Sequence, residues 1–240
     1  MTVACTSYYE IPIETPIRPK LDVSAFQRVL VAGFIAGGTD DVDGNLETTR
    51  LLRSQLRTKS EMRVIDTDVL PLMDVATESR ATSKTPAEAE DSSAPAAIRE
   101  DADLEPYEHV FADVEYWKRI GEEYQQPLIV TGTVMFAPQA RSGIVQRDQE
   151  VYDSFGRRRV VPVRTYMERK GFVLKPRFIF IDGRTGTVLH SENFREEILY
   201  NANQTSPALS SYFELMDRLI PSFLSTLSSQ KIKGTRVLLQ

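Results

Sequence analysis

The sequence predicts an α/β fold in which a mixed β-sheet is covered by helices. Compact apolar runs at residues 28–34 and 128–136 have the length and composition of strands buried on both faces. Apolar residues recur with helical spacing at 45–58 and 206–227, and residues 172–191 read as strand, turn and strand. Because strands and helices alternate first and strands then follow one another, we expect one mixed sheet with helical layers.

The composition is that of an ordinary globular protein with one main domain. The chain has 240 residues, of which 41% are hydrophobic and 26% charged, and its formal net charge is −5. This balance provides no overall field that would attract nucleic acid. We expect a single domain at 28–229, preceded by an N-terminal tether at 1–27 and followed by a C-terminal tail at 230–240. The longest apolar runs fall well short of the roughly 20 residues that a membrane-spanning helix needs.

Cys5 is the only cysteine, which excludes an internal disulfide and a multi-cysteine metal site. Val3, Ala4 and Cys5 resemble the end of a bacterial lipoprotein cleavage box, although Thr2 stands where leucine is preferred. Cys5 is therefore a candidate lipidation site, provided that a signal segment lies upstream of Met1. If Met1 is the true start, Cys5 is an incidental thiol and the protein is cytoplasmic. The prolines of the tether exclude helix and predict extended chain.

The first half of the domain begins with the strand at 28–34. The helix at 45–58 follows, with Asp43 or Asn45 able to cap its start. A short strand at 62–66 and a helix or turn at 69–75 come next. Residues 78–106 contain no aromatic side chain and are rich in Ala, Ser, Thr, Pro and acidic residues, so we expect a disordered insertion there.

The second half begins with a helix from Asp113, whose buried face includes Trp117 and which ends before Pro127. The strand at 128–136 follows. A β-hairpin at 172–191 turns at residues 182–186, where two glycines permit positive φ. A helix then starts at Ser206 and Pro207, and Pro221 should kink or divide it.

Three stretches carry a family resemblance: VLVAGF at 29–34 with the helix that follows, the segment 117–134 with Gly132, and FIFIDGRTGTVLHSE at 178–192. In this succession the chain resembles the CsgG-like and TolB N-terminal-like superfamily of bacterial envelope lipoproteins. That superfamily includes the curli secretion component and lipoprotein activators of peptidoglycan synthases. The match spans 28–75 and 110–197, about half of the chain. It implies a periplasm-facing, outer-membrane-anchored protein of the cell envelope.

The segment 141–170 departs from the resemblance and bears on function. The curli channel is built from hairpins inserted into such a domain, and each membrane strand needs about 9 to 11 residues with an apolar outward face. Residues 144–153 carry charges on both faces, and a midplane arginine would cost roughly 2 to 4 kcal/mol. We therefore expect a water-exposed hairpin turning near residues 154–156. Its candidate contacts with an anionic partner, such as a glycan, a phosphate or an acidic protein, are Tyr152, Phe155, Arg157, Arg158, Arg159 and Tyr166. The alternative is an ordinary solvated hairpin tip.

Sites for catalysis, cofactors or metals find little support. The loop at 33–44 follows a strand and precedes a helix, but it lacks the GxGxxG spacing and a Walker lysine. A calcium loop at 39–50 would have Thr39 and Arg50 where ligands are required. His109 and His190 have no local signature.

The sequence thus favours a non-enzymatic, envelope lipoprotein-like binding or assembly module that acts through protein contacts. It needs no cofactor, and envelope proteins or further copies of the chain are its expected partners. The alternative is a subunit of an oligomeric secretion or surface-assembly apparatus similar to the curli channel. An enzyme that uses the 33–44 loop on a nucleotide or phosphate is the least favoured hypothesis.

Overall fold

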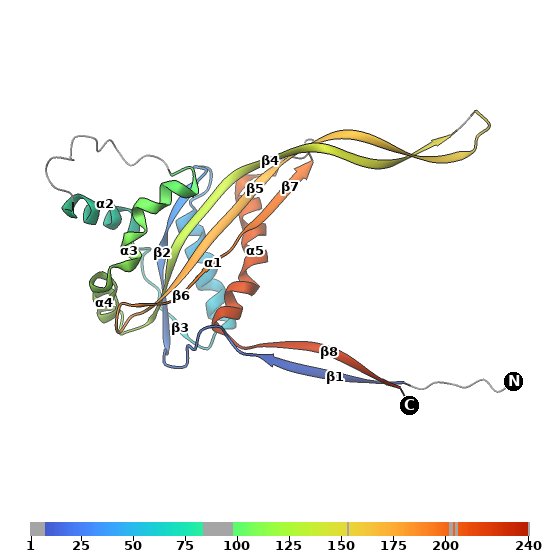
Figure 1. The fold of residues 1–240 in the computed structure, drawn as a ribbon. Helices are drawn as coiled ribbons and strands as arrows, with labels where there is room; N and C mark the ends of the chain where they lie inside the picture. The colour runs from blue at the N-terminus through green and yellow to red at the C-terminus, as the bar shows by residue number, and fades with distance from the viewer. Residues whose placement is uncertain (1–7, 84–97, 153, 202–203, 205, 240) are drawn as a thin grey trace.

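The computed structural model describes residues 8–83, 98–152, 154–201, 204 and 206–239. A six-stranded mixed sheet runs through the body in the order β3-β2-β4-β5-β6, and β7 pairs with β5 beside β6 (Figure 1). β2 is parallel to β3 and β4, whereas β5 is antiparallel to β4, β6 and β7. The strands are β2 (Arg28–Gly38), β3 (Arg63–Val64), β4 (Leu128–Tyr152), β5 (Arg158–Asp182), β6 (Val188–Asn193) and β7 (Glu196–Asn201). The two halves of the chain meet in one sheet, which confirms the predicted fold class.

Helices cover both faces of this sheet (Figure 1). Alternate side chains of a strand point to opposite faces, so Val29 and Val31 pack on one side and Leu30 and Ala32 on the other. The first face is covered by α1 (Gly44–Lys59) and α5 (Ala208–Leu227). The second is covered by α2 (Leu72–Ser83), the 3-10 helix η2 (Asp101–Tyr107), α3 (His109–Ala112) and α4 (Val114–Glu123).

Local capping signals set the starts of two helices. The Asp43 carboxylate accepts a hydrogen bond from the Leu46 amide at 3.0 Å and caps α1. Asn45, the other candidate, instead accepts from the Phe34 amide of β2 at 2.7 Å. α5 runs unbroken through Pro221, so the expectation that this proline divides the helix is wrong. Buried neighbours such as Phe223 hold α5 against the sheet on both sides of the proline.

The predicted disordered insertion at 78–106 is wrong at both of its ends. α2 continues to Ser83, and the chain is ordered again from Ile98, where η2 soon begins. Ile98 and Leu104 are buried in the second core, and the Ile98 carbonyl accepts a hydrogen bond from the Gly38 amide at 2.8 Å. This polar segment is therefore ordered by the burial of Ile98 and Leu104 and by the backbone hydrogen bond to Gly38 of β2. Residues 84–97 lie outside the described part of the chain.

The predicted tether and tail are not free segments, because they pair with each other. β1 (Tyr8–Ile17) and β8 (Gln230–Leu239) form a two-stranded antiparallel ribbon. The register runs from Tyr8↔Leu239 to Ile17↔Gln230. The extended conformation predicted from the prolines is present, and a two-stranded ribbon tolerates proline at its outer edge. After β1 the chain joins the body, where the Leu21 amide donates to the Thr226 carbonyl of α5 at 3.0 Å.

The longest feature is the pairing of β4 with β5 over 25 positions, from Leu128↔Asp182 to Tyr152↔Arg158. The beginning of β4 and the end of β5 lie in the central sheet. The rest of the two strands leaves the body as an arm (Figure 1). This arm contains the predicted hairpin at 141–170, and its turn lies at residues 154–156 as predicted. Among the described residues, none of the helices has the length and apolarity to span a membrane.

Candidate interaction surface

The two faces of the hairpin at 141–170 differ in character. One face carries Ile144 opposite Tyr166, followed toward the tip by polar or charged pairs such as Gln146 opposite Arg164. On the other face nearly every cross-strand pair contains one apolar residue. These residues are Val145, Val151, Val161, Val163 and Met167. This second face presents a discontinuous apolar stripe to solvent, which is unusual for a segment with no core beneath it.

The tip combines aromatic and basic side chains. Phe155 lies in the turn with 83% of its surface exposed, and the Arg157 guanidinium stands over its ring at 5.8 Å. Tyr152, 66% exposed, is the cross-strand partner of Arg158, which forms an ion pair with Glu150. These side chains can stack on or pair with a planar or anionic group of a partner.

The structure separates two of the predicted contact residues from this tip. Tyr166 lies eight residues along β5 from Arg158, roughly 26 Å away at the rise of a strand. Arg159 is opposite Val151 and therefore faces the apolar stripe rather than Tyr152. Of the predicted residues, Tyr166 therefore lies apart from the tip and nearer the body, where its cross-strand partner is Ile144.

The hairpin is basic although the whole chain is acidic. Residues 141–170 contain eight basic and four acidic residues, a net charge of +4 within a chain of −5. Arg147, Arg159 and Arg164 are exposed, and none of them forms an ion pair or a hydrogen bond with another described side chain. The hairpin therefore keeps cationic groups available for a partner.

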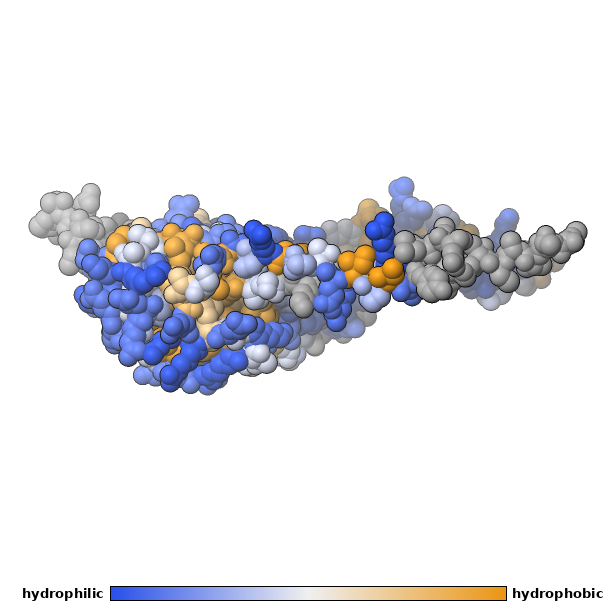
Figure 2. Space-filling model, turned by 90° about the horizontal axis from the view of Figure 1, so that it is seen from below, coloured by the Kyte–Doolittle hydropathy of each residue, from blue (hydrophilic) through white to orange (hydrophobic). Residues whose placement is uncertain are grey.

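A second exposed surface was not predicted. Ile11, Ile13 and Ile17 of β1 lie on one face of the ribbon and are 44%, 39% and 45% exposed. Figure 2 shows hydrophobic surface both on the body and along the projecting ribbon. The sequence signal that could have predicted this surface is the alternation of isoleucine with other residues in the tether.

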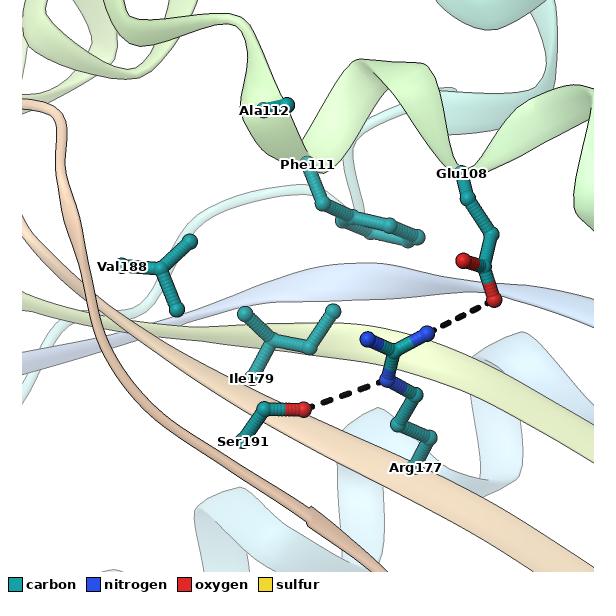
Figure 3. Close-up of a pocket in the computed structure, with 7 residues that line it drawn as sticks. All are labelled: Glu108, Phe111, Ala112, Arg177, Ile179, Val188 and Ser191. Carbon is teal, nitrogen blue, oxygen red and sulfur yellow. Dashed lines mark hydrogen bonds and ion pairs between the residues drawn. The ribbon is translucent and has the colours of Figure 1, made fainter.

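A small cavity of about 240 Å³ lies between the α3 region and the β5–β6 pair (Figure 3). Arg177 enters it from β5 and donates from Nη1 to Glu108 Oε1 at 2.7 Å and from Nε to Ser191 Oγ at 3.1 Å. Phe111, Ile179 and Val188 form its apolar wall. Because the guanidinium is already neutralised by Glu108, the arrangement ties the helical layer to the sheet. It is also smaller than the 300 Å³ or more typical of ligand pockets.

The glycines of the 33–44 loop serve the chain's own packing. A Cβ at Gly37 would lie 2.3 Å from a methyl group of Ile98, and one at Gly38 would lie 1.8 Å from the Phe136 carbonyl oxygen. Two of the three carboxylates of the loop are also engaged, since Asp43 caps α1 and Asp41 accepts from the Thr39 hydroxyl at 3.0 Å. The described residues contain no group of three or more His, Cys, Asp or Glu side chains that could hold a metal ion.

The two histidines lie on opposite faces of the sheet. His109 belongs to the second helical layer, where its ring nitrogens contact the Ser79 hydroxyl at 2.8 Å and the Pro106 carbonyl at 2.9 Å. His190 lies against Phe180 of the first core and contacts Glu192. The structure therefore does not bring the imidazoles together.

Glu192 joins three parts of the body. Burial alone would raise the pKa of its carboxyl group, but hydrogen bonds from Lys20, Thr226 and His190 outweigh this and lower the pKa. Lys20 follows the ribbon, Thr226 lies on α5 and Glu192 lies on β6. The ion pair between Lys20 and Glu192 fixes the base of the ribbon to the sheet.

No protein-family model matches the sequence, and no curated protein matches it. Lipoprotein GNA1162 from Neisseria meningitidis has a similar structure, with 10% identity, a TM-score of 0.35 and coverage of 82% of this chain and 97% of that one. A neuraminyllactose-binding hemagglutinin homologue from Helicobacter pylori has 12% identity, a TM-score of 0.36 and coverage of 87% and 86%. At these scores neither similarity assigns a function to the chain.

Proposed function

We propose that the protein is a non-enzymatic binding or assembly module of the bacterial cell envelope, acting through protein contacts made by its β4–β5 hairpin. The observation that carries this proposal is the arm itself, because two strands leave the central sheet and expose aromatic, apolar and basic side chains away from any core. Phe155, Tyr166 and Ile144, exposed at 83%, 68% and 72%, are its largest exposed apolar groups. Side chains of these types dominate the centres of protein interfaces.

We further propose that the protein faces the periplasm and is held at the outer membrane by a lipid on Cys5. Cys5 lies outside the described residues and precedes β1 by three positions. When the gene is expressed with its natural upstream sequence, we expect incorporation of labelled palmitate, and Cys5→Ser should abolish it. A protein that carries no label and stays soluble would refute the anchor.

A second candidate function is a subunit of an oligomeric secretion or surface-assembly apparatus similar to the curli channel. It is favoured by one feature, namely that β4 and β5 pass without a break from the sheet into the protruding hairpin. The curli channel is likewise assembled from hairpins inserted into such a domain. Size measured in detergent extracts separates the candidates. A stable ring that keeps its size in about 1 M salt supports the second, whereas a monomer, or an assembly that dissociates at that salt concentration, supports the first.

The proposed contact surface is tested by site-specific photo-crosslinking in cells. A benzoylphenylalanine is placed at Phe155 or Tyr166 on the hairpin, and at Leu209, which is 44% exposed on α5, as the control. We expect protein adducts from the two hairpin positions and none from Leu209. Absence of adducts from the hairpin, or equal yields from all three positions, would contradict the proposal.

A further inference from the structure

Charge is divided between the two ends of the molecule. The helical layer on the second face of the sheet, residues 72–83 and 98–123, contains eleven acidic and four basic residues, a net charge of −7. We call it the acidic layer. The hairpin at 141–170 carries +4. Figure 1 places α2, α3 and α4 at one end of the molecule and the hairpin at the other.

Ion pairs within the chain consume only a small part of this charge. In the acidic layer, Asp101 and Glu108 pair with Lys175 and Arg177 of β5. Glu105, Glu122 and Glu123 are exposed and form no ion pair with another described residue. On the hairpin, Arg147, Arg159 and Arg164 are likewise without an ion-pair partner among the described residues, so both surfaces keep uncompensated charge.

The geometry excludes contact between these surfaces within one copy. The hairpin is about 40 Å long, as follows from twelve residues per strand at the rise of a β-strand, and it points away from the acidic layer (Figure 1). Two hairpins packed against each other would bring like charges together. The same is true of two acidic layers.

Resting on the proposed function of the hairpin as a contact surface, we propose that its partner is a second copy of this chain, bound head to tail. The basic hairpin of one copy lies on the acidic layer of the next. The apolar stripe that includes Val145, Val151 and Val161 forms the buried, water-free part of the interface. Since the two surfaces differ, the contact is heterologous and each added copy leaves one hairpin and one acidic layer open, so the assembly closes as a ring or grows as a filament.

The test uses purified full-length chain and two charge-reversed variants. The hairpin variant carries Arg147→Glu, Arg159→Glu and Arg164→Glu, which changes the hairpin from +4 to −2. The layer variant carries Glu105→Lys, Glu122→Lys and Glu123→Lys, which changes the acidic layer from −7 to −1. All six side chains are exposed. Circular dichroism and thermal unfolding confirm that both variants fold.

Mass is measured by size-exclusion chromatography with light scattering in about 0.1 M and about 1 M salt, between which the Debye length falls from ~10 Å to ~3 Å. The unmodified chain should give a multiple of 27.2 kDa at low salt and shift to the monomer at high salt. Each variant alone should be monomeric. An equal mixture should give a species of twice 27.2 kDa, because the intact hairpin of the layer variant meets the intact acidic layer of the hairpin variant.

Two results would overturn the inference. One is an unmodified chain that stays monomeric at both salt concentrations. The other is a layer variant that still self-associates while the mixture gains nothing, which would show hairpin-to-hairpin pairing. Crosslinks from Phe155 or Tyr166 to a different protein alongside a monomeric purified chain would leave the proposed function standing and remove only the second copy as partner. Absence of all crosslinks would remove the proposed function itself.

Discussion

Removal of the hairpin should leave the body folded. Neither core cluster contains a residue between 137 and 171, and the pairing of β5 with β7 uses only residues 169–174 of β5. Gly143 and Met167 are cross-strand partners, so residues 144–166 can be replaced by an Asn-Gly turn that suits a two-residue hairpin connection.

The size of the effect follows from the connection that is shortened. Replacing 23 residues by two lowers the entropy cost of closing the chain by about 2 kcal/mol, taken as (3/2)RT ln(23/2), if the hairpin itself adds nothing. The nine lost cross-strand pairs act in the opposite direction, but a two-stranded hairpin by itself is marginally stable at best in water, so their contribution largely offsets the entropy cost of ordering the arm itself. The free energy of unfolding should therefore change by about 2 kcal/mol or less, which corresponds to roughly 8 °C at most for a chain of this size.

Thermal unfolding followed by circular dichroism provides the measurement, together with urea unfolding. The shortened protein should unfold in one cooperative transition and should lose its crosslinks and its self-association. A fall of the midpoint well beyond roughly 8 °C, or loss of the cooperative transition, would show that the arm is part of the folding core. The distinction between body and arm would then be wrong.

Three further predictions concern the body. Gly132→Ala should abolish soluble expression or lower the free energy of unfolding by more than about 4 kcal/mol, as measured by urea unfolding. The reason is that φ of Gly132 is +143° and the new Cβ would lie 1.8 Å from the Arg177 carbonyl oxygen. Tyr212→Phe should cost about 0.5 to 1.5 kcal/mol, since its buried hydroxyl donates to the Gly44 carbonyl at 3.1 Å, and retention of full stability would contradict that hydrogen bond. Backbone amides of residues 99 and 100 hold the pKa of the Asp103 carboxyl below its ordinary value, so its contribution is present at neutral pH and is lost as the pH falls through the folded-state pKa. The stability difference between the unmodified chain and Asp103→Asn should therefore shrink below about pH 4, and a difference that grows in acid would refute the assignment.

Elements with strong local signals could be predicted from the sequence. Asp43 and Asp113 cap α1 and α4 at the expected positions, with amide hydrogen bonds of 3.0 Å each. The turn at 182–186 closes the β5–β6 hairpin, and Gly186 adopts the positive φ of +75° that the glycines suggested. Each of these features depends on residues within about four positions of one another.

Features that depend on distant partners could not be predicted. β1 pairs with β8 across more than 200 residues, and nothing within either strand identifies the other. Ile98 looks solitary in a polar segment, but the glycines of β2 leave the space that it fills. On the hairpin, the position of the turn could be predicted, whereas the separation of Tyr166 from the tip depends on the register of β4 with β5.

The pairing of β1 with β8 has a consequence for biosynthesis. Ile17 pairs with Gln230, which is synthesised 213 residues later. At a synthesis rate of roughly 5 to 20 residues per second, β1 has no β8 to pair with for about 10 to 40 s. A chain that terminates before β8 therefore keeps β1 as an open, isoleucine-bearing edge, which can pair with other chains.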